Sequence, residues 1–246
     1  MQTLETYSKF VLPHLNKIII KNKLVLEKIS KKLVSEVKNG RFLFVFGSGH
    51  SALFPMELYH RAGGANFVIP VSNAALLPFY GPKKLRQLER KEGSFRKFLD
   101  HCAPVKGEML WLASQSGING GIIDLAFYAR ELGLYTVCFT NLEHSKNVQS
   151  RHSSGKKLYE ICNIVVDIGG RIGDAVVPCK KGLFLGPVSS LSLIFLGHSI
   201  LVNVCAELEN ARQHCVYTSV NTPDGELLNL ALEKIAKKRD PYLNKS

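Results

Sequence analysis

The chain has 246 residues, of which 46% are hydrophobic and 21% charged, close to the averages for soluble globular proteins. This composition excludes a disordered, collagen-like or coiled-coil chain, and a chain of this length buries enough surface to fold without disulfide or metal staples. The 32 Lys and Arg outnumber the 20 Asp and Glu, and the net charge of +12 predicts an anionic partner without identifying it.

The first expected element in chain order is a long amphipathic helix. Apolar residues recur at every third or fourth position over residues 5–37. Lysines alternate with this apolar stripe, which is typical of a solvated helix surface and accounts for part of the positive charge. Pro13 is expected to break the helix near its start, and Gly40 to end it.

Five short apolar runs follow, and each is expected to form a strand: residues 42–46, 67–71, 109–113, 135–139 and 164–168. Helical patterns follow the first run (52–62) and the third run (118–132), and residues 81–104 form a basic, mostly helical excursion. Runs that are apolar throughout are typical of parallel strands covered on both faces. The alternation predicts an α/β fold, three-layer and doubly wound, with a five-stranded parallel sheet and helical extensions at both ends.

An uncharged segment between Lys181 and Glu207 is long enough to cross a membrane. Polar residues throughout it, with Gly182, Gly186 and Pro187 near its start, favour instead a helix of roughly 20 residues buried inside the protein. The six cysteines form no CxxC pair, so we expect reduced thiols in a cytoplasmic protein.

Two loops rich in glycine and serine are expected to follow the first and third strands. They read GSGHS at 47–51 and SQSGINGG at 114–121, and each runs into a helix. Ligands of parallel sheets bind at the carboxyl ends of the strands, and the free N–H groups of a helix N-terminus stabilise an anion. The two loops together therefore predict a phosphate site, although His50 either faces the ligand or only closes its turn. The loop residues expected at this site are Ser48, Gly49, His50, Ser51, Ser114, Ser116, Gly117 and Asn119.

Neither loop matches a nucleotide-binding fingerprint. A GxGxxG motif would need glycine in place of Leu53, and no acidic residue ends the second strand to hold a ribose. The first loop also lacks the Gly-Lys-Ser/Thr that ends a P-loop. A small phosphorylated ligand is therefore favoured over a nucleotide, and no cofactor is expected.

The two loops in this order resemble the sugar isomerase (SIS) domain family, whose phosphate loop reads S-x-S-G-x-T/N. The resemblance spans about residues 37–209, and RAGG at 61–64 and SVNTP at 219–223 resemble a branch between phosphoheptose isomerases and N-acetylmuramic acid 6-phosphate etherases. It implies one SIS domain over residues 1–246, with an N-terminal helical element (1–40), a core (41–209) and a C-terminal extension (210–246). It also implies a phosphosugar ligand and a homodimer or homotetramer whose sites take residues from a neighbouring subunit.

Two titratable groups are candidates for proton transfer. Isomerisation through an enediol, and likewise elimination of a lactyl ether, needs a base with a pKa near neutrality. His198 lies in the uncharged segment, where the resemblance to phosphoheptose isomerases implies a histidine base; the alternative is a hydrogen-bonded core histidine. Glu57 is expected to share a helix face with Arg61, so it either exchanges protons or only pairs with that arginine. The resemblance implies a glutamate at position 61, and arginine cannot replace it as an acid or base.

Further candidates follow the fifth strand. Asp174 is expected either to bind a sugar hydroxyl or to serve a turn or helix cap, and Ser189 and Ser190 to start the late helix and face the ligand. His144 and His152 lie eight positions apart without carboxylate partners, so no metal site is expected.

The leading functional hypothesis is a phosphosugar isomerase, with an etherase-type lyase and a non-catalytic phosphosugar sensor as alternatives. Nucleic-acid binding rests on the net charge alone, because the lysines are dispersed and no helix-turn-helix or aromatic RNA-binding platform is present in the sequence. The expected partners are therefore a small phosphorylated sugar and further copies of the chain, with no nucleic acid and no membrane.

Overall fold

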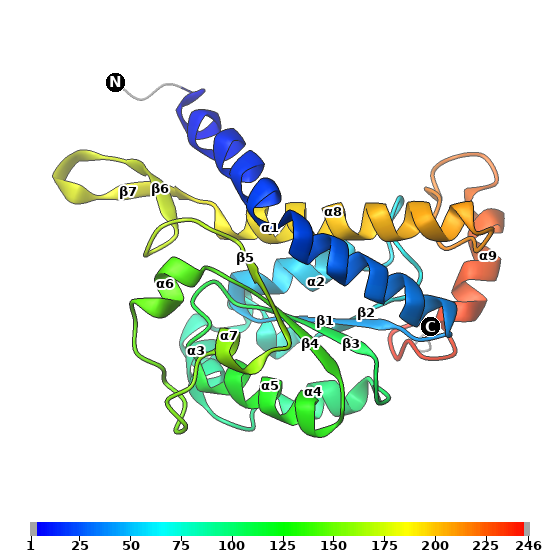
Figure 1. Ribbon diagram of the computed structural model, residues 1–246, viewed down its shortest axis with the longest axis horizontal. Helices are drawn as coiled ribbons and strands as arrows, with labels where there is room; N and C mark the ends of the chain where they lie inside the picture. Colours follow the sequence, from blue (N-terminus) through cyan, green and yellow to red (C-terminus); the bar gives the residue numbers. More distant parts are fainter. Residues whose placement is uncertain (1–3, 244–246) are drawn as a thin grey trace.

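A five-stranded parallel sheet forms the middle layer of the computed structural model, which describes residues 4–243 (Figure 1). The strands are β1 (Leu43–Gly47), β2 (Val68–Val71), β3 (Met109–Ala113), β4 (Tyr135–Thr140) and β5 (Ile164–Asp167), in the order β2-β1-β3-β4-β5. Nearly all of their residues are buried, because helices cover both faces. The predicted three-layer α/β fold is confirmed, and no strand bound differs from the predicted one by more than one residue.

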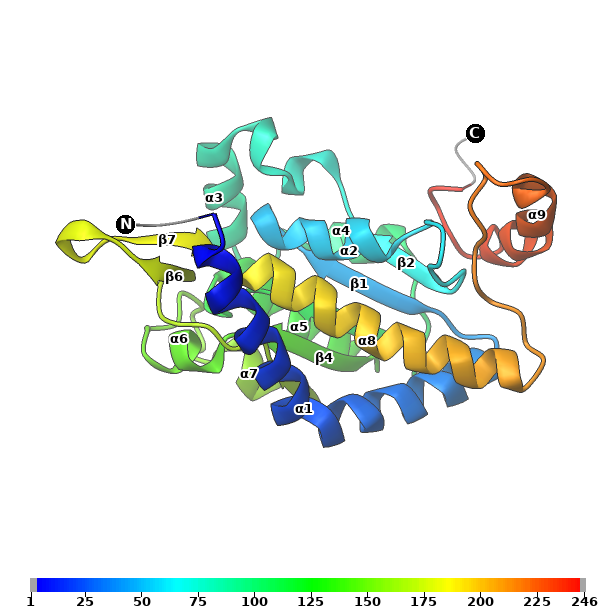
Figure 2. The ribbon, with the colours of Figure 1, turned by 90° about the horizontal axis from the view of Figure 1, so that it is seen from above.

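Helices cover the sheet on both faces (Figures 1 and 2). One face carries α1 (Thr6–Lys38), α2 (Leu53–Leu58) and α8 (Ser189–Asn210). The other carries α3 (Pro82–Arg90), α4 (Arg96–His101), α5 (Gly120–Glu131) and α7 (Leu158–Ile161). The doubly wound arrangement follows from right-handed crossovers between parallel strands.

The remaining elements lie at the two ends of the sheet. Near its carboxyl edge are the short helix α6 (Leu142–Lys146) and an antiparallel hairpin of β6 (Ala175–Pro178) and β7 (Phe184–Pro187). The hairpin projects beside the N-terminal end of α1, and α9 (Gly225–Ala236) lies at the opposite end of the molecule (Figures 1 and 2). The sequence pattern did not predict the hairpin, because its short strands are partly exposed rather than apolar and buried throughout.

Two helices, α1 and α2, differ from the expected ones. Pro13 does not break α1, which is continuous from Thr6 to Lys38. Proline removes one backbone hydrogen bond, and the buried apolar stripe of the helix outweighs that loss. The helix predicted over 52–62 begins at Leu53 and ends at Leu58, because the chain beyond it pairs with the C-terminal segment. There the N–H of Gly63 donates to the carbonyl of Tyr217, 2.8 Å away.

A buried polar contact fixes α1 at the carboxyl end of β5. The amide of Asn22 donates to the carbonyl of Asp167 at 2.9 Å and accepts the Asp167 N–H at 3.0 Å. Lys21 bonds the Asp167 carboxylate at 2.6 Å. Burial by itself would raise the pKa of Asp167, but the hydrogen bonds from Lys21 and two backbone N–H groups bring it below its usual value. The carboxylate is therefore ionised and holds α1 against the sheet.

Helix α8 is the one described helix that is long and apolar enough to cross a membrane. Half of its most apolar window is buried inside the molecule, where it packs between α1 and α2 (Figure 2). The helix has about the expected length, and it is half buried rather than fully buried as expected. None of the six cysteines, all of which lie in the described part of the chain, forms a disulfide.

The close packing of α8 on α2 can be tested at Gly197. A Cβ at this position would lie 2.4 Å from the ring of Phe54, which is itself buried. We expect Gly197→Ala to lower the free energy of unfolding by about 1–3 kcal/mol, the usual cost of overpacking a core. Urea denaturation measures it, with Glu207→Ala on the exposed side of α8 as the control. Equal stability of both variants would contradict this packing.

Candidate functional site

The two glycine- and serine-rich loops meet at the carboxyl edge of the sheet. Strands β1 and β3 are hydrogen-bonded neighbours, with Gly47 opposite Ala113, so the loops leave the sheet side by side. They line one cavity of about 560 Å³. All of the residues predicted to bind the ligand line it except Gly117: Ser48, Gly49, His50, Ser51, Ser114, Ser116, Asn119, Asp174, Ser189 and Ser190.

Gly117 shapes the second loop from behind. Its φ of +61° is in the left-handed region, and a Cβ there would lie 2.8 Å from the hydroxyl of Thr140. Its N–H donates to the Ser114 hydroxyl at 3.1 Å, and its carbonyl accepts from the N–H of Leu158 at 2.9 Å. The glycine therefore gives the loop its turn, and Ser114 and Ser116 reach the cavity as a result.

Helix α5 begins where the second loop ends. The first N–H groups of a helix have no partner within it, and its N-terminal dipole end is positive, so this region favours an anion. The Asn119 side chain that precedes the helix accepts a hydrogen bond from Arg151 at 2.7 Å and also lines the cavity. The second loop thus combines backbone donors, hydroxyls and an amide at one place.

Asp174 caps the N-terminus of α8. Its carboxylate accepts from the N–H groups of Ser189 at 2.8 Å and Val188 at 3.2 Å, and from the Ser189 hydroxyl at 2.7 Å. Of the two roles expected for Asp174, the cap is therefore present. Binding of a sugar hydroxyl by the same carboxylate stays a prediction.

Helix α3 contributes two further charged residues to the cavity, Arg86 and Glu89. The Ser48 hydroxyl donates to the Glu89 carboxylate at 2.8 Å. Arg86 is the one Lys or Arg among the described residues that line the cavity. Nothing in the sequence indicated either residue, because both lie in the excursion between β2 and β3, whose position depends on tertiary packing.

The loop after β4 brings His144 to the cavity, beside Gln115 of the second loop. The His144 Nδ1 accepts the backbone N–H of Gly173 at 3.2 Å and lies 3.2 Å from the Gln115 amide nitrogen. Burial lowers the pKa of His144, and the charge of Asp174 offsets this only in part. The ring is therefore neutral with its proton on Nε2. Its place just after a strand's carboxyl end was the available signal in the sequence.

The two predicted catalytic residues, His198 and Glu57, lie together but outside the residues that line the cavity. The His198 Nε2 is 3.5 Å from the Glu57 carboxylate, which also pairs with Arg61. Burial and the nearby charge of Arg61 lower the pKa of His198. Pairing with Arg61 was one of the two roles expected for Glu57, and it is present. The two residues do not share a helix face as expected, because α2 ends at Leu58, before Arg61. A catalytic role for either residue stays a prediction.

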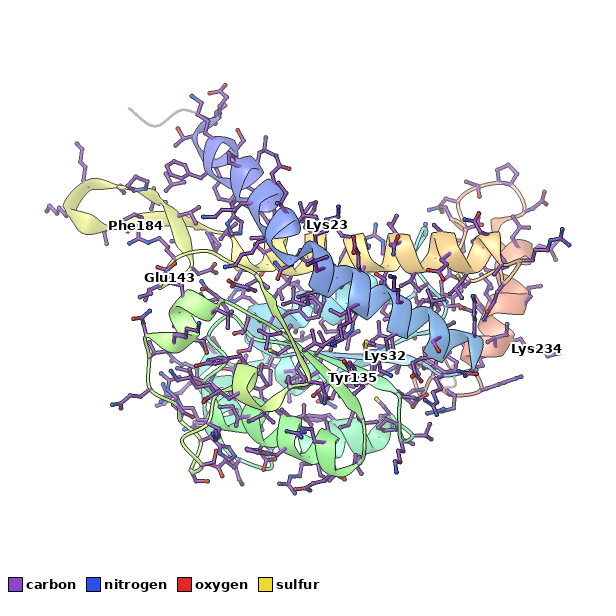
Figure 3. All side chains as sticks on the ribbon, in the orientation of Figure 1. Lys23, Lys32, Tyr135, Glu143, Phe184 and Lys234 are labelled. Atoms are coloured by element: carbon purple, nitrogen blue, oxygen red, sulfur yellow. The ribbon has the colours of Figure 1, made fainter. Side chains whose placement is uncertain are left out.

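The positive charge of the molecule lies mainly away from the cavity. Lys23 on α1 and Lys234 on α9 are exposed and lie on different parts of the surface (Figure 3). In the part of the chain that the structure describes, no cluster of three or more His, Cys, Asp or Glu side chains has a geometry that could hold a metal ion. The groups at the cavity that can donate hydrogen bonds to an anion are therefore mainly hydroxyls, amides and the N–H groups of helix N-termini, and Arg86 is the one Lys or Arg among the described lining residues.

Comparison with known proteins establishes the family. The family model for the SIS domain matches residues 6–141, more than half of the chain, so this protein belongs to the SIS-domain family. Within it, the chain is 34% identical to a UPF0309 protein of Shouchella clausii over 247 residues, which covers 99% of this chain and 100% of that relative. A UPF0309 protein of Oceanobacillus iheyensis is 33% identical over 242 residues, with 97% and 98% covered. The resemblance stated from the two loops is thus confirmed.

Two solved structures have the same fold. A phosphoheptose isomerase from Francisella tularensis aligns with a TM-score of 0.53 at 15% identity, covering 83% of this chain and 98% of its own. The sugar isomerase domain of an RpiR transcription factor from Sphaerobacter thermophilus aligns with a TM-score of 0.51 at 15% identity, covering 85% and 93%. Similarity at this level of identity is similarity of fold.

The protonation of His144 can be measured directly. We expect its ring to titrate below about 6.5, the usual histidine pKa, with the proton on Nε2 at neutral pH. As the pH falls below about 6.5, the unfolded chain takes up this proton before the folded chain does, so the free energy of unfolding decreases. Nitrogen NMR of the ring reports both the midpoint and the tautomer, with His144→Gln to assign the signals. A higher midpoint, or a proton on Nδ1, would contradict the contacts described above.

Proposed function

We propose that the cavity binds a small phosphorylated sugar. The observation that carries this proposal is the convergence of two Gly/Ser loops, from neighbouring parallel strands, with the N-terminus of α5 in one cavity. A volume of about 560 Å³ is in the range of small-molecule sites. The phosphoheptose isomerase and the sugar isomerase domain that share the fold support the same ligand class.

The reaction that we propose is aldose–ketose isomerisation through an enediol. This chemistry moves a proton between adjacent carbons and needs titratable side chains rather than a cofactor. The cavity holds such side chains next to its hydroxyl and amide donors. A non-catalytic sensor is the second candidate, because Arg61 stands where the family resemblance implies a glutamate and the same fold occurs in a transcription factor.

We further propose that residues 1–246 act as one SIS unit in the cytoplasm. Helix α8 lies beyond the matched residues 6–141, yet it packs between α1 and α2 and completes one face of the sheet. The reduced state of the six thiols fits the cytoplasm.

Binding and reaction can be tested separately on a panel of pentose, hexose and heptose phosphates. Calorimetric titration measures binding, and incubation in deuterated water followed by NMR measures proton exchange at C1 and C2. We expect exchange with at least one member of the panel. Binding without exchange would favour the sensor, lactate release from N-acetylmuramic acid 6-phosphate would favour the lyase, and no binding at all would refute the proposed ligand class.

Ser116 provides the sharpest test of the phosphate loop. Loss of one hydrogen bond to a charged ligand costs about 1.5–3 kcal/mol. We therefore expect Ser116→Ala to weaken binding of the phosphosugar about tenfold to a hundredfold. Ser35→Ala, on the exposed surface of α1, is the matched control. The affinity of the unphosphorylated sugar should differ little between Ser116→Ala and the wild type.

We propose that the protein is a homo-oligomer in which His198 and Glu57 reach the cavity of a second copy. Their side chains are 33% and 36% exposed, so they are accessible to a partner but do not line the cavity of their own chain. Large apolar side chains are exposed on the same two helices: Leu53 and Met56 on α2, and Leu191 on α8. Burial of such side chains is the usual driving force of association.

Oligomerisation predicts two measurable results. Light scattering should give a dimer or tetramer, and Met56→Glu should dissociate it, because a carboxylate would be buried without a partner. Leu227→Glu on the exposed side of α9 is the control.

A shared site also predicts complementation. Mixing His198→Ala with Ser116→Ala chains, at a phosphosugar concentration below KM, should give more proton exchange than the average of the two separate variants, because a mixed oligomer contains one intact site. A monomeric wild type, or a mixture no more active than that average, would contradict the shared site.

A further inference from the structure

Two titratable side chains line the cavity and have no role assigned to them so far. Glu89 comes from α3, in the excursion between β2 and β3, and His144 comes from α6, after β4. The two residues are far apart in sequence, and packing of the elements around the carboxyl edge brings them to one cavity. In each residue one polar atom is hydrogen-bonded to the protein: an oxygen of the Glu89 carboxylate and the Nδ1 of His144.

The Glu89 carboxylate is positioned but not neutralised. One of its oxygens accepts the hydrogen bond from Ser48, and among the described residues no cation pairs with it. Gly49 allows this approach, because a Cβ there would lie 3.2 Å from the carboxylate oxygen. The buried ring of Phe95 and the side chain of Leu85 line the same cavity. A half-buried carboxylate with an apolar wall and one free oxygen is suited to accept a proton.

This carboxylate also distinguishes the two loops. A negative charge bonded to Ser48 repels a phosphate at the first loop. The other carboxylate that lines the cavity, Asp174, is bonded to the N-terminus of α8. Among the described residues no carboxylate is hydrogen-bonded to the second loop, which precedes the N-terminus of α5, so a phosphate is favoured there. A sugar held by its phosphate at the second loop can then extend toward the first loop, where Glu89 lies.

His144 is arranged as a neutral hydrogen-bond donor. Its Nδ1 is occupied by the N–H of Gly173, so the ring proton is on Nε2. In the described part of the chain no protein group bonds Nε2, and the ring lines the cavity. A neutral imidazole can donate this proton to a carbonyl oxygen and later recover one from a neighbouring hydroxyl.

We propose that Glu89 and His144 are the catalytic acid–base pair of the isomerisation, and this proposal rests on the proposed function. The Glu89 carboxylate takes the proton from C2 of the aldose, and the electron pair of that bond forms the C1–C2 double bond. The carbonyl electrons move to O1, which takes the Nε2 proton of His144. The resulting imidazolate then takes the O2 proton as the C2 carbonyl forms, which restores the neutral ring, and Glu89 returns its proton to C1. Atoms and electrons balance without a co-reactant.

The pair also accounts for the arginine at position 61. Glu57 is held by Arg61 and lies outside the cavity of its own chain, so it offers no free carboxylate there. Glu89 brings a carboxylate to the cavity from a different element, so the chain retains a carboxylate for proton transfer although position 61 does not provide it.

The test measures C2 proton exchange in deuterated water with the phosphosugar of the panel that the wild type exchanges fastest. General acid–base groups contribute about a hundredfold to ten-thousandfold in rate. We expect Glu89→Gln to lower kcat for exchange at least about a hundredfold with little change in KM, because the amide keeps the Ser48 contact but cannot take a proton. His144→Ala should lower kcat about tenfold or more, and His144→Gln, which keeps a donor, should lose less.

The controls are matched in chemistry. Glu131→Gln, exposed at the far end of α5, and His101→Asn, exposed at the end of α4, remove the same groups outside the cavity and should leave kcat unchanged. Thermal unfolding shows whether each variant is folded.

The outcomes separate this proposal from the proposed function. If the exchange rate of Glu89→Gln stays within about threefold of the wild-type rate, the proposed pair is wrong and the proposed isomerisation stands. Wild-type binding without any exchange would overturn the pair and the isomerase together while leaving the ligand class. A large loss in Glu89→Gln with unchanged calorimetric affinity supports the pair.

Discussion

The backbone ladder between β1 and β3 is the interaction on which the site depends. It sets Gly47 opposite Ala113 and therefore places both Gly/Ser loops at one point of the carboxyl edge. The strand order is β2-β1-β3-β4-β5. From β1 the chain adds β2 on one side, and it then adds β3, β4 and β5 on the other side. Such a switch point opens a crevice for a ligand in a doubly wound sheet. The cavity lies at this crevice, with the N-terminus of α5 at its side.

Helix packing on the face of the sheet that carries α3 and α5 determines which other side chains reach that crevice. The two glycines that begin α5 allow α3 to approach closely: a Cβ on Gly120 would lie 2.6 Å from the carbonyl of Arg90, and one on Gly121 3.0 Å from that of Glu89. This contact carries Glu89 and Arg86 into the cavity. The glycines that follow the second loop thus allow close helix packing, and this packing determines which side chains line the cavity.

The parts predicted well from the sequence are those determined by local pattern and burial. Each strand of the sheet is mostly apolar, so its bounds could be predicted to within one residue. The failures are places where distant contacts overrule a local preference. Pro13 stays within α1 because the rest of the helix is packed, and α2 ends early because the chain after it pairs near Tyr217.

By itself the sequence determined the fold class, the two loops that line the cavity and the SIS family, because strand burial, glycine spacing and hydroxyl-rich turns are local properties of the chain. Only the tertiary structure decided which charged groups share the cavity. Glu89 and His144 line it, whereas His198 and Glu57 lie together outside it. The physical reason is that helix packing between segments far apart in sequence determines which side chains meet at one edge of the sheet. The spacing of residues along the chain does not determine this packing.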